Sequence, residues 1–233
     1  MRIFGKGFNF NQDGPGNRLV YHLQGCNMRC PWCSNPEGMS SFGGIEYSIE
    51  EISRECARSQ AMFFSGGGVT FTGGEATLCC GELIQLLIRL KARGIHTAIE
   101  TNGTSPRLAE IAKHVDYLIM DIKHYDADAH LKYTAVPITT VRKNYEDLCR
   151  SGRQLHIRIP LINGVNSDNP EKFAEYLASC RSDSAVYEIL PYHEYGKDKW
   201  KTEYTITNGF VSRDQVAELD RALKERGLKT ITT

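Results

Sequence analysis

Residues 19–33 read Leu-Val-Tyr-His-Leu-Gln-Gly-Cys-Asn-Met-Arg-Cys-Pro-Trp-Cys and join a strand-like run to a loop with three cysteines. The run from Leu19 to Gly25 is rich in apolar and β-branched residues and has the length of a buried strand. Cys26, Cys30 and Cys33 follow it with the spacing C-x3-C-x2-C. In α/β proteins the chemistry lies in the loops that follow parallel strands, so this stretch predicts both a fold class and a site.

Five further runs of the same kind follow, and segments with helical periodicity lie between them. The runs are Val69 to Thr72, His96 to Thr101, Tyr117 to Ile122, Leu155 to Leu161 and Val186 to Leu190. The helices are predicted at about Ile49 to Met62, Leu78 to Arg93, Pro106 to His114, Thr139 to Ser151, Pro170 to Cys180 and Ser212 to Arg226. This alternation predicts an α/β fold in one domain, with six βα units on a parallel sheet that is open or partly closed into a barrel.

Helix boundaries are signalled by individual residues. Gly94 and Gly152 follow two of the predicted helices, as C-terminal glycines do. Ser105 precedes Pro106 as an expected N-cap, and Ser212 stands three residues before Gln215, which is the spacing of a capping box.

The composition restricts the class of partner. The 233 residues hold 28 Lys and Arg against 28 Asp and Glu, so there is no broad basic field for nucleic acid or for an anionic membrane. The longest apolar stretch, Leu83 to Leu90, is interrupted by polar residues and is far shorter than the roughly 20 residues of a membrane span. Met1 to Phe10 lacks the apolar core of a secretory signal, so we expect an intracellular, thiol-reducing compartment without disulfides.

The cysteine cluster indicates a metal centre. Three thiolates on one short loop can wrap one metal site, but a structural zinc normally takes four protein ligands, and no fourth Cys or His stands at finger-like spacing. A 4Fe-4S cluster held by three cysteines leaves one iron open for another ligand. A zinc knuckle and a coincidental cluster of packing cysteines are the alternatives. The remaining cysteines are expected to be buried as small apolar residues: Cys56, Cys79, Cys80, Cys149 and Cys180.

Gly73-Gly74-Glu75 follows the second predicted strand. Glycines allow a close approach of the backbone to a ligand, and a carboxylate complements an ammonium group. A phosphate-binding loop is the competing interpretation, but no Gly-Lys-Ser/Thr follows and Glu75 is negative.

These motifs resemble those of the radical S-adenosylmethionine superfamily. In that superfamily the three cysteines bind a 4Fe-4S cluster, and the Gly-Gly-Glu motif contacts the methionyl amino group of S-adenosylmethionine bound to the open iron. The resemblance implies a partial (β/α)6 TIM-type barrel and cluster ligands Cys26, Cys30 and Cys33.

Further segments resemble the glycyl-radical-enzyme activating enzymes, most closely the short pyruvate formate-lyase-activating type. They are Asp13-Gly-Pro-Gly-Asn-Arg18, Glu100-Thr-Asn-Gly103, Asp121-Ile-Lys123 and Leu190-Pro-Tyr-His-Glu-Tyr-Gly-Lys-Asp-Lys-Trp200. This sequence has Asn17 where the family has an apolar residue, and Glu100 where it has aspartate. Residues 34–72 are too few for the inserted ferredoxin-like domain of the larger activating enzymes and contain only Cys56, so no second cluster is expected.

The resemblance assigns roles to individual residues. The expected contacts to S-adenosylmethionine are Trp32, Ser34, Gly73, Gly74, Glu75, Glu100, Asp121, Lys123 and His193. Glu100, Thr101 and Asp121 are the expected ligands of a monovalent cation, and Asp13 and Arg158 are expected to hold the substrate peptide. The alternatives are an Asx-type turn at Glu100 to Gly103, a surface charge or structural histidine for Lys123 and His193, a structural salt bridge for Arg158 and loop anchoring for Trp32.

The implied activity is reductive cleavage of S-adenosylmethionine followed by removal of a glycine α-hydrogen in a partner enzyme. The partner would be a glycyl radical enzyme, the reductant flavodoxin or ferredoxin, and the protein an oxygen-sensitive cytoplasmic monomer that binds neither nucleic acid nor membrane. Residues 1–233 are expected to form one radical S-adenosylmethionine domain, with 1–18 and 195–233 as extensions of it. The alternatives are a radical enzyme that acts on a small molecule, the activating enzyme of anaerobic ribonucleotide reductase and a non-enzymatic zinc-binding module.

Overall fold

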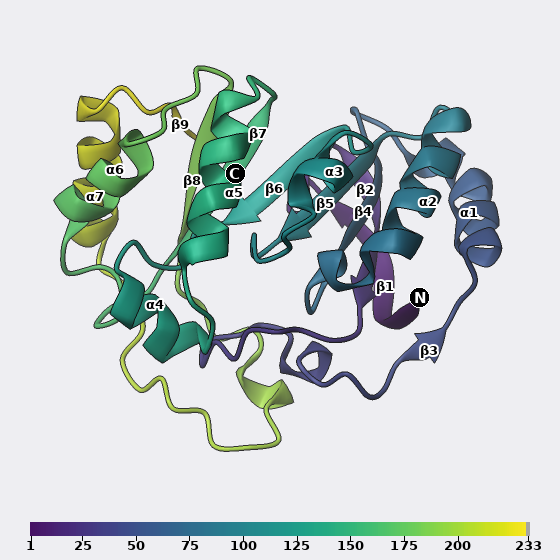
Figure 1. Cartoon of the computed structure of the whole chain (residues 1–233). Coiled ribbons are helices and arrows are strands. Elements are labelled where there is room, and N and C mark those ends of the chain that lie inside the picture. Colours follow the sequence, from purple (N-terminus) through teal and green to yellow (C-terminus); the bar gives the residue numbers. More distant parts are fainter. Residues whose placement is uncertain (232–233) are drawn as a thin grey trace. The chain divides into compact units, whose positions relative to one another are not determined.

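The computed structural model describes residues 1–231, which fall into two compact units (Figure 1). Unit 1 comprises residues 1–27, 35–101 and 105–119, and unit 2 comprises residues 28–34, 102–104 and those from 120 onward. Residues 232–233 of the predicted C-terminal extension 195–233 lie outside the described part.

The sheet of unit 1 has the hydrogen-bonded order β3-β1-β2-β4-β5-β6. β1 runs antiparallel to both of its neighbours, whereas β2, β4 and β5 are parallel, with Leu19 beside Val69 and Val69 beside Thr97. The last two residues of β6 belong to unit 2. The strands are β1 (Arg2–Phe10), β2 (Asn17–Leu23), β3 (Ile45–Glu46), β4 (Gly68–Gly73), β5 (Thr97–Thr101) and β6 (Tyr117–Asp121).

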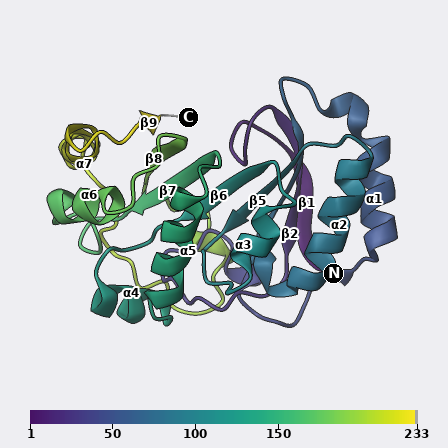
Figure 2. The same cartoon turned by 45° about the horizontal axis from the view of Figure 1, so that its top comes forward.

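Helices cover the sheet of unit 1 through apolar faces. α1 and α2 lie side by side (Figure 2), and the buried residues of α2 include Leu83, Leu86, Leu87 and Leu90, which recur at helical spacing. The α-helices are α1 (Ile49–Arg58), α2 (Cys80–Ala92) and α3 (Leu108–Ala112), and the 3-10 turns are η1 (Pro36–Gly38), η2 (Gln60–Met62) and η3 (Ala76–Cys79).

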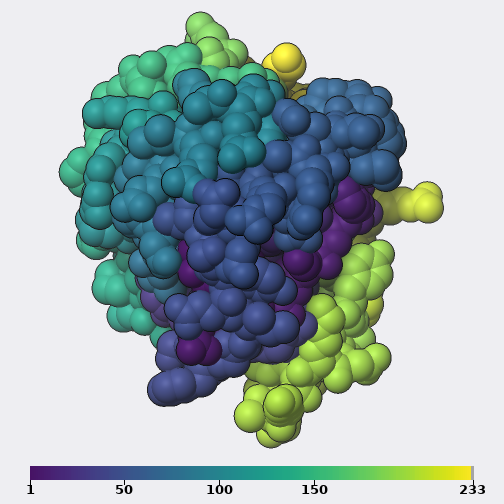
Figure 3. Space-filling view, turned by 90° about the vertical axis from the view of Figure 1, so that its right-hand side faces the viewer, coloured from purple at the N-terminus to yellow at the C-terminus, as the bar shows by residue number. Residues whose placement is uncertain are grey.

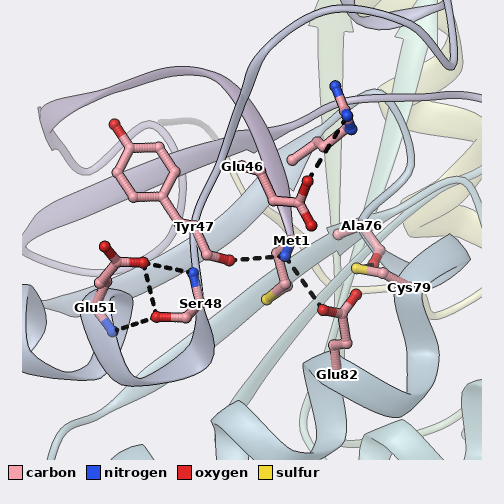
Figure 4. Close-up of polar contacts among 9 residues, drawn as sticks. Met1, Glu46, Tyr47, Ser48, Glu51, Ala76, Cys79 and Glu82 are labelled. Atoms are coloured by element: carbon pink, nitrogen blue, oxygen red, sulfur yellow. Dashed lines mark hydrogen bonds and ion pairs between the residues drawn. The ribbon is translucent and has the colours of Figure 1, made fainter.

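Polar contacts fix the amino end of unit 1. The Met1 amino group donates to the Tyr47 carbonyl oxygen at 2.8 Å and to Glu82 Oε1 at 3.2 Å (Figure 4). α1 begins next to this point with a complete capping box between Ser48 and Glu51. Figure 3 shows the face of unit 1 on which β1, in purple, emerges beside the blue segment that carries β3 and α1. The hydrogen bond from the Met1 amino group to Tyr47 holds the start of β1 close to the start of α1.

In unit 2, the end of β6 and the strands β7 to β9 follow in chain order, and the β7–β8 and β8–β9 pairs are parallel. α6 and α7 pack against each other, as Figures 1 and 2 show. None of the described helices is long and apolar enough to cross a membrane. The elements are α4 (Ala127–Thr134), α5 (Thr139–Arg150), β7 (Leu155–Leu161), α6 (Pro170–Ala178), β8 (Ala185–Pro191), η4 (Lys197–Lys199), α7 (Arg213–Glu225) and β9 (Thr230–Ile231).

The six predicted strands correspond to β2, β4, β5, β6, β7 and β8, and the six predicted helices are also present. Gly94 and Gly152 adopt φ values of +69° and +68° after α2 and α5, and Ser212 forms the predicted capping box with Gln215. The predicted N-cap at Ser105 is wrong, because α3 begins only at Leu108. The first helix is also shorter than predicted, since it ends at Arg58 before η2.

Three strands and one α-helix of the described residues were not predicted. β1, β3 and β9 are edge or near-edge strands with little buried apolar surface, and α4 buries only His130 and Thr134. Elements that bury so little have no strong hydrophobic period in the sequence.

The five cysteines outside the cluster differ in burial. Cys56, Cys80 and Cys149 are buried as predicted, and burial raises the pKa of Cys56 and of Cys149 to about 12. Cys79 and Cys180 are only partly buried, which corrects the expectation for these two, and Cys180 follows α6 instead of lying in it.

Candidate functional site

The cysteine loop begins where β2 ends. Gly25 has φ +99°, a value that favours glycine, and its N–H donates to the Gly38 carbonyl oxygen at 2.9 Å. Its own carbonyl oxygen accepts from the Glu75 N–H at 2.7 Å. Cys26, which also belongs to unit 1, therefore follows a backbone that is tied directly to the Gly-Gly-Glu segment.

The other two cysteines belong to unit 2. The Cys33 N–H donates to the Cys30 carbonyl oxygen at 3.2 Å, which closes a tight turn between them. Trp32 is buried in this turn and packs against Tyr133 of α4 at a ring distance of 6.0 Å. This contact agrees with the loop-anchoring alternative for Trp32.

Cysteine thiolates are suitable ligands for an iron–sulfur cluster. The positive charge of Lys123 would offset the negative charge of thiolates at Cys30 and Cys33. Lys123 is close enough to Cys30 and Cys33 for these thiols to raise its pKa. Within residues 1–231 no three His, Cys, Asp or Glu side chains gather as ready metal ligands. The ligand assignment of Cys26, Cys30 and Cys33 therefore stays a prediction.

Gly73 and Gly74 are required by backbone packing. A Cβ atom at Gly73 would lie 2.2 Å from the Leu23 nitrogen, and one at Gly74 would lie 2.0 Å from the Gly25 carbonyl oxygen. The Gly74 N–H donates to the Leu23 carbonyl oxygen at 2.8 Å. The two glycines thus bring the end of β4 against the end of β2, a packing role that was not predicted beside their expected contact with a ligand.

The Glu75 carboxylate is buried, with the residue only 2% exposed. Its Oε1 accepts from the Thr77 N–H at 2.9 Å, from the Thr77 hydroxyl and from the Thr101 hydroxyl at 2.7 Å. Beside it, Thr72 donates to Glu100 Oε2 at 2.7 Å. Two carboxylates are thus oriented by hydroxyl groups at the carboxyl ends of β4 and β5, where a cationic group would be favoured.

At the end of β6, Asp121 and Lys123 form an ion pair. Lys123 Nζ donates to Asp121 Oδ2 at 2.8 Å, and the Lys123 side chain is only 14% exposed. Burial acts to lower the pKa of Lys123, but Asp121 and the thiols of Cys30 and Cys33 outweigh burial and raise it above its ordinary value. Lys123 is therefore a cation near neutral pH, and the two residues act together, although the sequence assigned them separate roles.

Arg158 forms a buried ion pair with Glu188. The two residues lie opposite each other on β7 and β8, and Arg158 Nε donates to Glu188 Oε2 at 2.8 Å. Their side chains are 9% and 1% exposed. This is the structural salt bridge that the sequence left open as the alternative for Arg158. The pairing is compatible with a second role, because a guanidinium group has five N–H donors.

The C-terminal motif contacts the cysteine loop. His193 stacks on Tyr195 with ring centroids 4.2 Å apart, and burial lowers the pKa of His193, so its imidazole is neutral at pH 7. Trp200 Nε1 donates to the Cys33 carbonyl oxygen at 3.1 Å, and Lys199 Nζ donates to the Ser34 carbonyl oxygen at 3.2 Å. Lys199 and Trp200 belong to the C-terminal motif, but no role was predicted for either from the sequence.

Asp13 lies in the turn between β1 and β2. Its carboxylate accepts from Asn9 Nδ2 at 2.5 Å, and its carbonyl oxygen accepts from the Thr70 hydroxyl at 2.7 Å. This turn precedes β2, whereas Gly25 follows it, and the 7 residues of β2 span roughly 20 Å at about 3.3 Å per residue. Asp13 therefore lies near the amino ends of the parallel strands β2 and β4, whereas Glu75 lies beyond the carboxyl end of β4.

Comparison with known proteins identifies the family. The model of the Radical SAM superfamily matches residues 20–177, which include the cysteine loop and the ends of β4, β5, β6 and β7. The chain belongs to this superfamily, whose members use a 4Fe-4S cluster and S-adenosylmethionine.

Two curated relatives within this superfamily are pyruvate formate-lyase-activating enzymes. A pyruvate formate-lyase-activating enzyme of Staphylococcus epidermidis is 37% identical over 201 residues, which are 81% of this chain and 80% of that protein. A pyruvate formate-lyase-activating enzyme of Clostridium pasteurianum is 34% identical over 226 residues, which are 91% of this chain and 92% of that protein.

Two solved structures are also similar to this chain. A domain of pyruvate-formate lyase-activating enzyme from Bacteroides vulgatus matches with a TM-score of 0.61 and 31% identity, over 72% of this chain and 99% of that chain. A radical SAM methyltransferase from Sphaerobacter thermophilus shares the fold, with a TM-score of 0.70 and 16% identity, over 97% of this chain and 68% of that chain. The predicted α/β partial-barrel class is confirmed.

Proposed function

We propose that this protein is the activating enzyme of a glycyl radical enzyme of the pyruvate formate-lyase type. The observation that carries the proposal is the match to activating enzymes over 80% and 92% of their own lengths. We further propose that residues 1–233 act as one radical SAM domain, with 1–18 and 195–233 as its extensions.

The proposed cluster ligands are the thiols of Cys26, Cys30 and Cys33. When bound, the cluster supplies the electron that splits S-adenosylmethionine into methionine and a 5′-deoxyadenosyl radical, which can take the α-hydrogen of a glycine. Lys123 supports this ligand set because its positive charge lies near Cys30 and Cys33 and offsets the negative charge of thiolates.

The methionyl part of S-adenosylmethionine carries an ammonium and a carboxylate group. We assign the ammonium group to Glu75, whose carboxylate is held in one orientation by Thr77 and Thr101. We assign the carboxylate group to Lys123, which Asp121 keeps charged and in place. The remaining proposed contacts to S-adenosylmethionine are Trp32, Ser34, Gly73, Gly74, Glu100, Asp121 and His193.

A monovalent cation at Glu100, Thr101 and Asp121 is a further proposal. Carboxylate and hydroxyl oxygens are suitable ligands for a hard cation. Glu100 already accepts from Thr72, Thr101 donates to Glu75, and Asp121 pairs with Lys123. A cation would therefore have to bind oxygens that these bonds leave accessible or displace Lys123 from Asp121.

The substrate is proposed to be a glycine-containing loop of the partner enzyme. The Arg158 guanidinium can donate to backbone carbonyl oxygens while its Nε remains on Glu188. Asp13 lies at the amino end of β2, roughly 20 Å from its carboxyl end, so it can accept from backbone N–H groups only in a more distant part of the same loop. We propose flavodoxin or ferredoxin as the reductant and a monomer in an anaerobic cytoplasm, without binding to nucleic acid or membrane.

Anaerobic reconstitution tests the proposal. We expect a 4Fe-4S electron paramagnetic resonance signal, formation of 5′-deoxyadenosine with a reductant, and a glycyl radical signal on an added pyruvate formate-lyase-type partner. Cleavage of S-adenosylmethionine without a protein radical on any such partner would support a small-molecule enzyme instead. A colourless protein with stoichiometric zinc would support the zinc-binding alternative.

Arg158→Lys is the informative variant for the peptide site. Lysine can keep the ion pair with Glu188 but lacks the planar fork of donors. We expect it to retain the cluster and cleavage of S-adenosylmethionine and to lose most glycyl radical formation. Equal glycyl radical yields in the variant and the wild type would show that Arg158 is only structural.

A further inference from the structure

The segment from Gly196 to Trp200 lies directly on the backbone of Cys33 and Ser34. A Cβ atom at Gly196 would be 2.5 Å from the Ser34 Cα and carbonyl oxygen, so no other residue could approach this closely without a backbone shift. Lys199 and Trp200 donate to the carbonyl oxygens of Ser34 and Cys33, from 165 and 167 residues away in the sequence. Three of the five residues in this segment therefore contact the same short piece of the cysteine loop.

The Trp200 indole is itself held in place. Its ring packs edge-on against Tyr204 at 5.5 Å, and the Tyr204 hydroxyl lies 2.7 Å from the Tyr192 hydroxyl. Tyr192 is buried directly after β8 and its N–H donates to the Leu161 carbonyl oxygen of β7. The Trp200 ring is thus held to the sheet of unit 2 through Tyr204 and Tyr192. Lys199, by contrast, ends in a flexible and more solvated ammonium group.

A carbonyl group in a loop that turns around a metal centre needs a partner. The Cys30 carbonyl oxygen accepts from the Cys33 N–H, and the Cys33 carbonyl oxygen accepts from Trp200. The first hydrogen bond fixes the peptide plane before Cys33, and the second fixes the peptide plane after it. Together they fix the direction of the Cys33 Cα–Cβ bond. A fixed Cα–Cβ direction limits the Cys33 sulfur to the few positions that the staggered χ1 rotamers allow.

We propose that Trp200 is a positioning residue for the cluster: its indole N–H fixes the backbone of Cys33 and thereby the sulfur that ligates iron. This inference rests on the proposed function, because it needs Cys33 to be a cluster ligand. It links the C-terminal motif, which also carries His193, to the third cysteine of the loop.

The test uses Trp200→Phe, which keeps an aromatic ring against Tyr204 and removes only the donor. In the cluster-free protein, the Cys33 amide keeps its bond to the Cys30 carbonyl oxygen, but loss of the bond to the Cys33 carbonyl oxygen makes this turn open more easily. One ordinary hydrogen bond less in the closed turn predicts about fivefold faster exchange at the Cys33 amide. In the reconstituted protein, we expect iron loss to a chelator to be faster by a similar factor. We also expect the reduced-cluster electron paramagnetic resonance signal to change.

Lys197→Met is the matched control, because it removes an ion pair with Glu194 and a cation–π contact with the Tyr204 ring but no hydrogen bond to the cysteine loop. We expect exchange, iron loss and the resonance signal to stay close to wild type in this control.

Two results would overturn the positioning role. One is an unchanged iron-loss rate in Trp200→Phe, whether or not the amide exchanges faster. The other is an equal change in both variants. Failure of the wild-type protein to bind any iron–sulfur cluster would instead refute the proposed function, and this role with it, so the two failures are distinguishable.

Discussion

Glu188 is the buried partner of Arg158, and replacing it by glutamine tests the energetics of this pair. The Glu188 side chain is 1% exposed, and its Oε2 accepts from Arg158 Nε at 2.8 Å. His156 Nε2 lies 2.9 Å from the same oxygen. Glu188→Gln preserves the volume but removes the negative charge, so the Arg158 guanidinium remains buried without its counter-charge.

The expected cost follows from this burial. Breaking a buried ion pair by removing one partner costs about 3 to 5 kcal/mol, and glutamine keeps an acceptor oxygen, so we expect a loss near the lower end, about 3 kcal/mol. For a chain of this length, about 3 °C of melting temperature corresponds to each kcal/mol, which gives a decrease of about 9 °C.

The pH dependence has a definite sign. Burial acts to raise the pKa of Glu188, but the interactions with His156 and Arg158 outweigh it, and the pKa lies below its ordinary value. A carboxylate with a lowered pKa stabilises the folded state above its unfolded pKa and loses this contribution as the pH falls through the folded pKa. The difference between wild type and Glu188→Gln is therefore complete at pH 7 and shrinks below the ordinary glutamate pKa of about 4.3.

Urea and thermal unfolding of the cluster-free protein, followed by circular dichroism from pH 3.5 to pH 8, measure both effects. Glu110→Gln is the control, because Glu110 pairs with Arg107 on an exposed surface, and we expect no measurable change from it. Equal stability of Glu188→Gln and wild type at pH 7, or a difference that grows in acid, would refute the reasoning.

Three further predictions concern the proposed site. Cys33→Ala should bind little iron and sulfide after anaerobic reconstitution, whereas Cys180→Ala should bind as much as wild type, measured by iron and sulfide assays. Glu75→Gln should weaken S-adenosylmethionine binding to the cluster-loaded enzyme by at least about tenfold, because a charged hydrogen bond of about 1.5 kcal/mol or more is lost, and calorimetry that shows unchanged affinity would contradict the assignment. Asp121→Asn removes the counter-charge of Lys123, so we expect lower affinity for S-adenosylmethionine, and an unchanged affinity in titrations would show that Lys123 needs no partner.

Much of the central fold was predictable from sequence. The strands β2 and β4 to β8 are rich in apolar and β-branched residues, because parallel strands covered by helices are buried on both faces. β1 could not be recognised in this way, because Phe8 and Phe10 are 46% and 50% exposed and its strand conformation depends on pairing with β2 and β3. α4 was missed for the same reason, since so little of it is buried that its sequence has no apolar period.

The candidate site was predictable only as a set of residue types. Cysteine spacing, Gly73-Gly74-Glu75 and the strand-end charges are local features, and each follows directly from the order of residues along the chain. The hydrogen-bond partners of these residues were not predictable, because Glu75 with Thr101 and Arg158 with Glu188 become neighbours only when parallel strands pair in register.

The sequence by itself therefore determined the family, the cofactor chemistry and the chain positions of the reactive residues, since spacing and strand periodicity are local properties. Only the tertiary structure decided that Lys123 forms an ion pair with Asp121, that Arg158 is buried on Glu188 and that Trp200 binds the Cys33 carbonyl oxygen. The physical reason is that hydrogen bonds and ion pairs act over about 3 Å, and the packing of the fold decides which groups come that close.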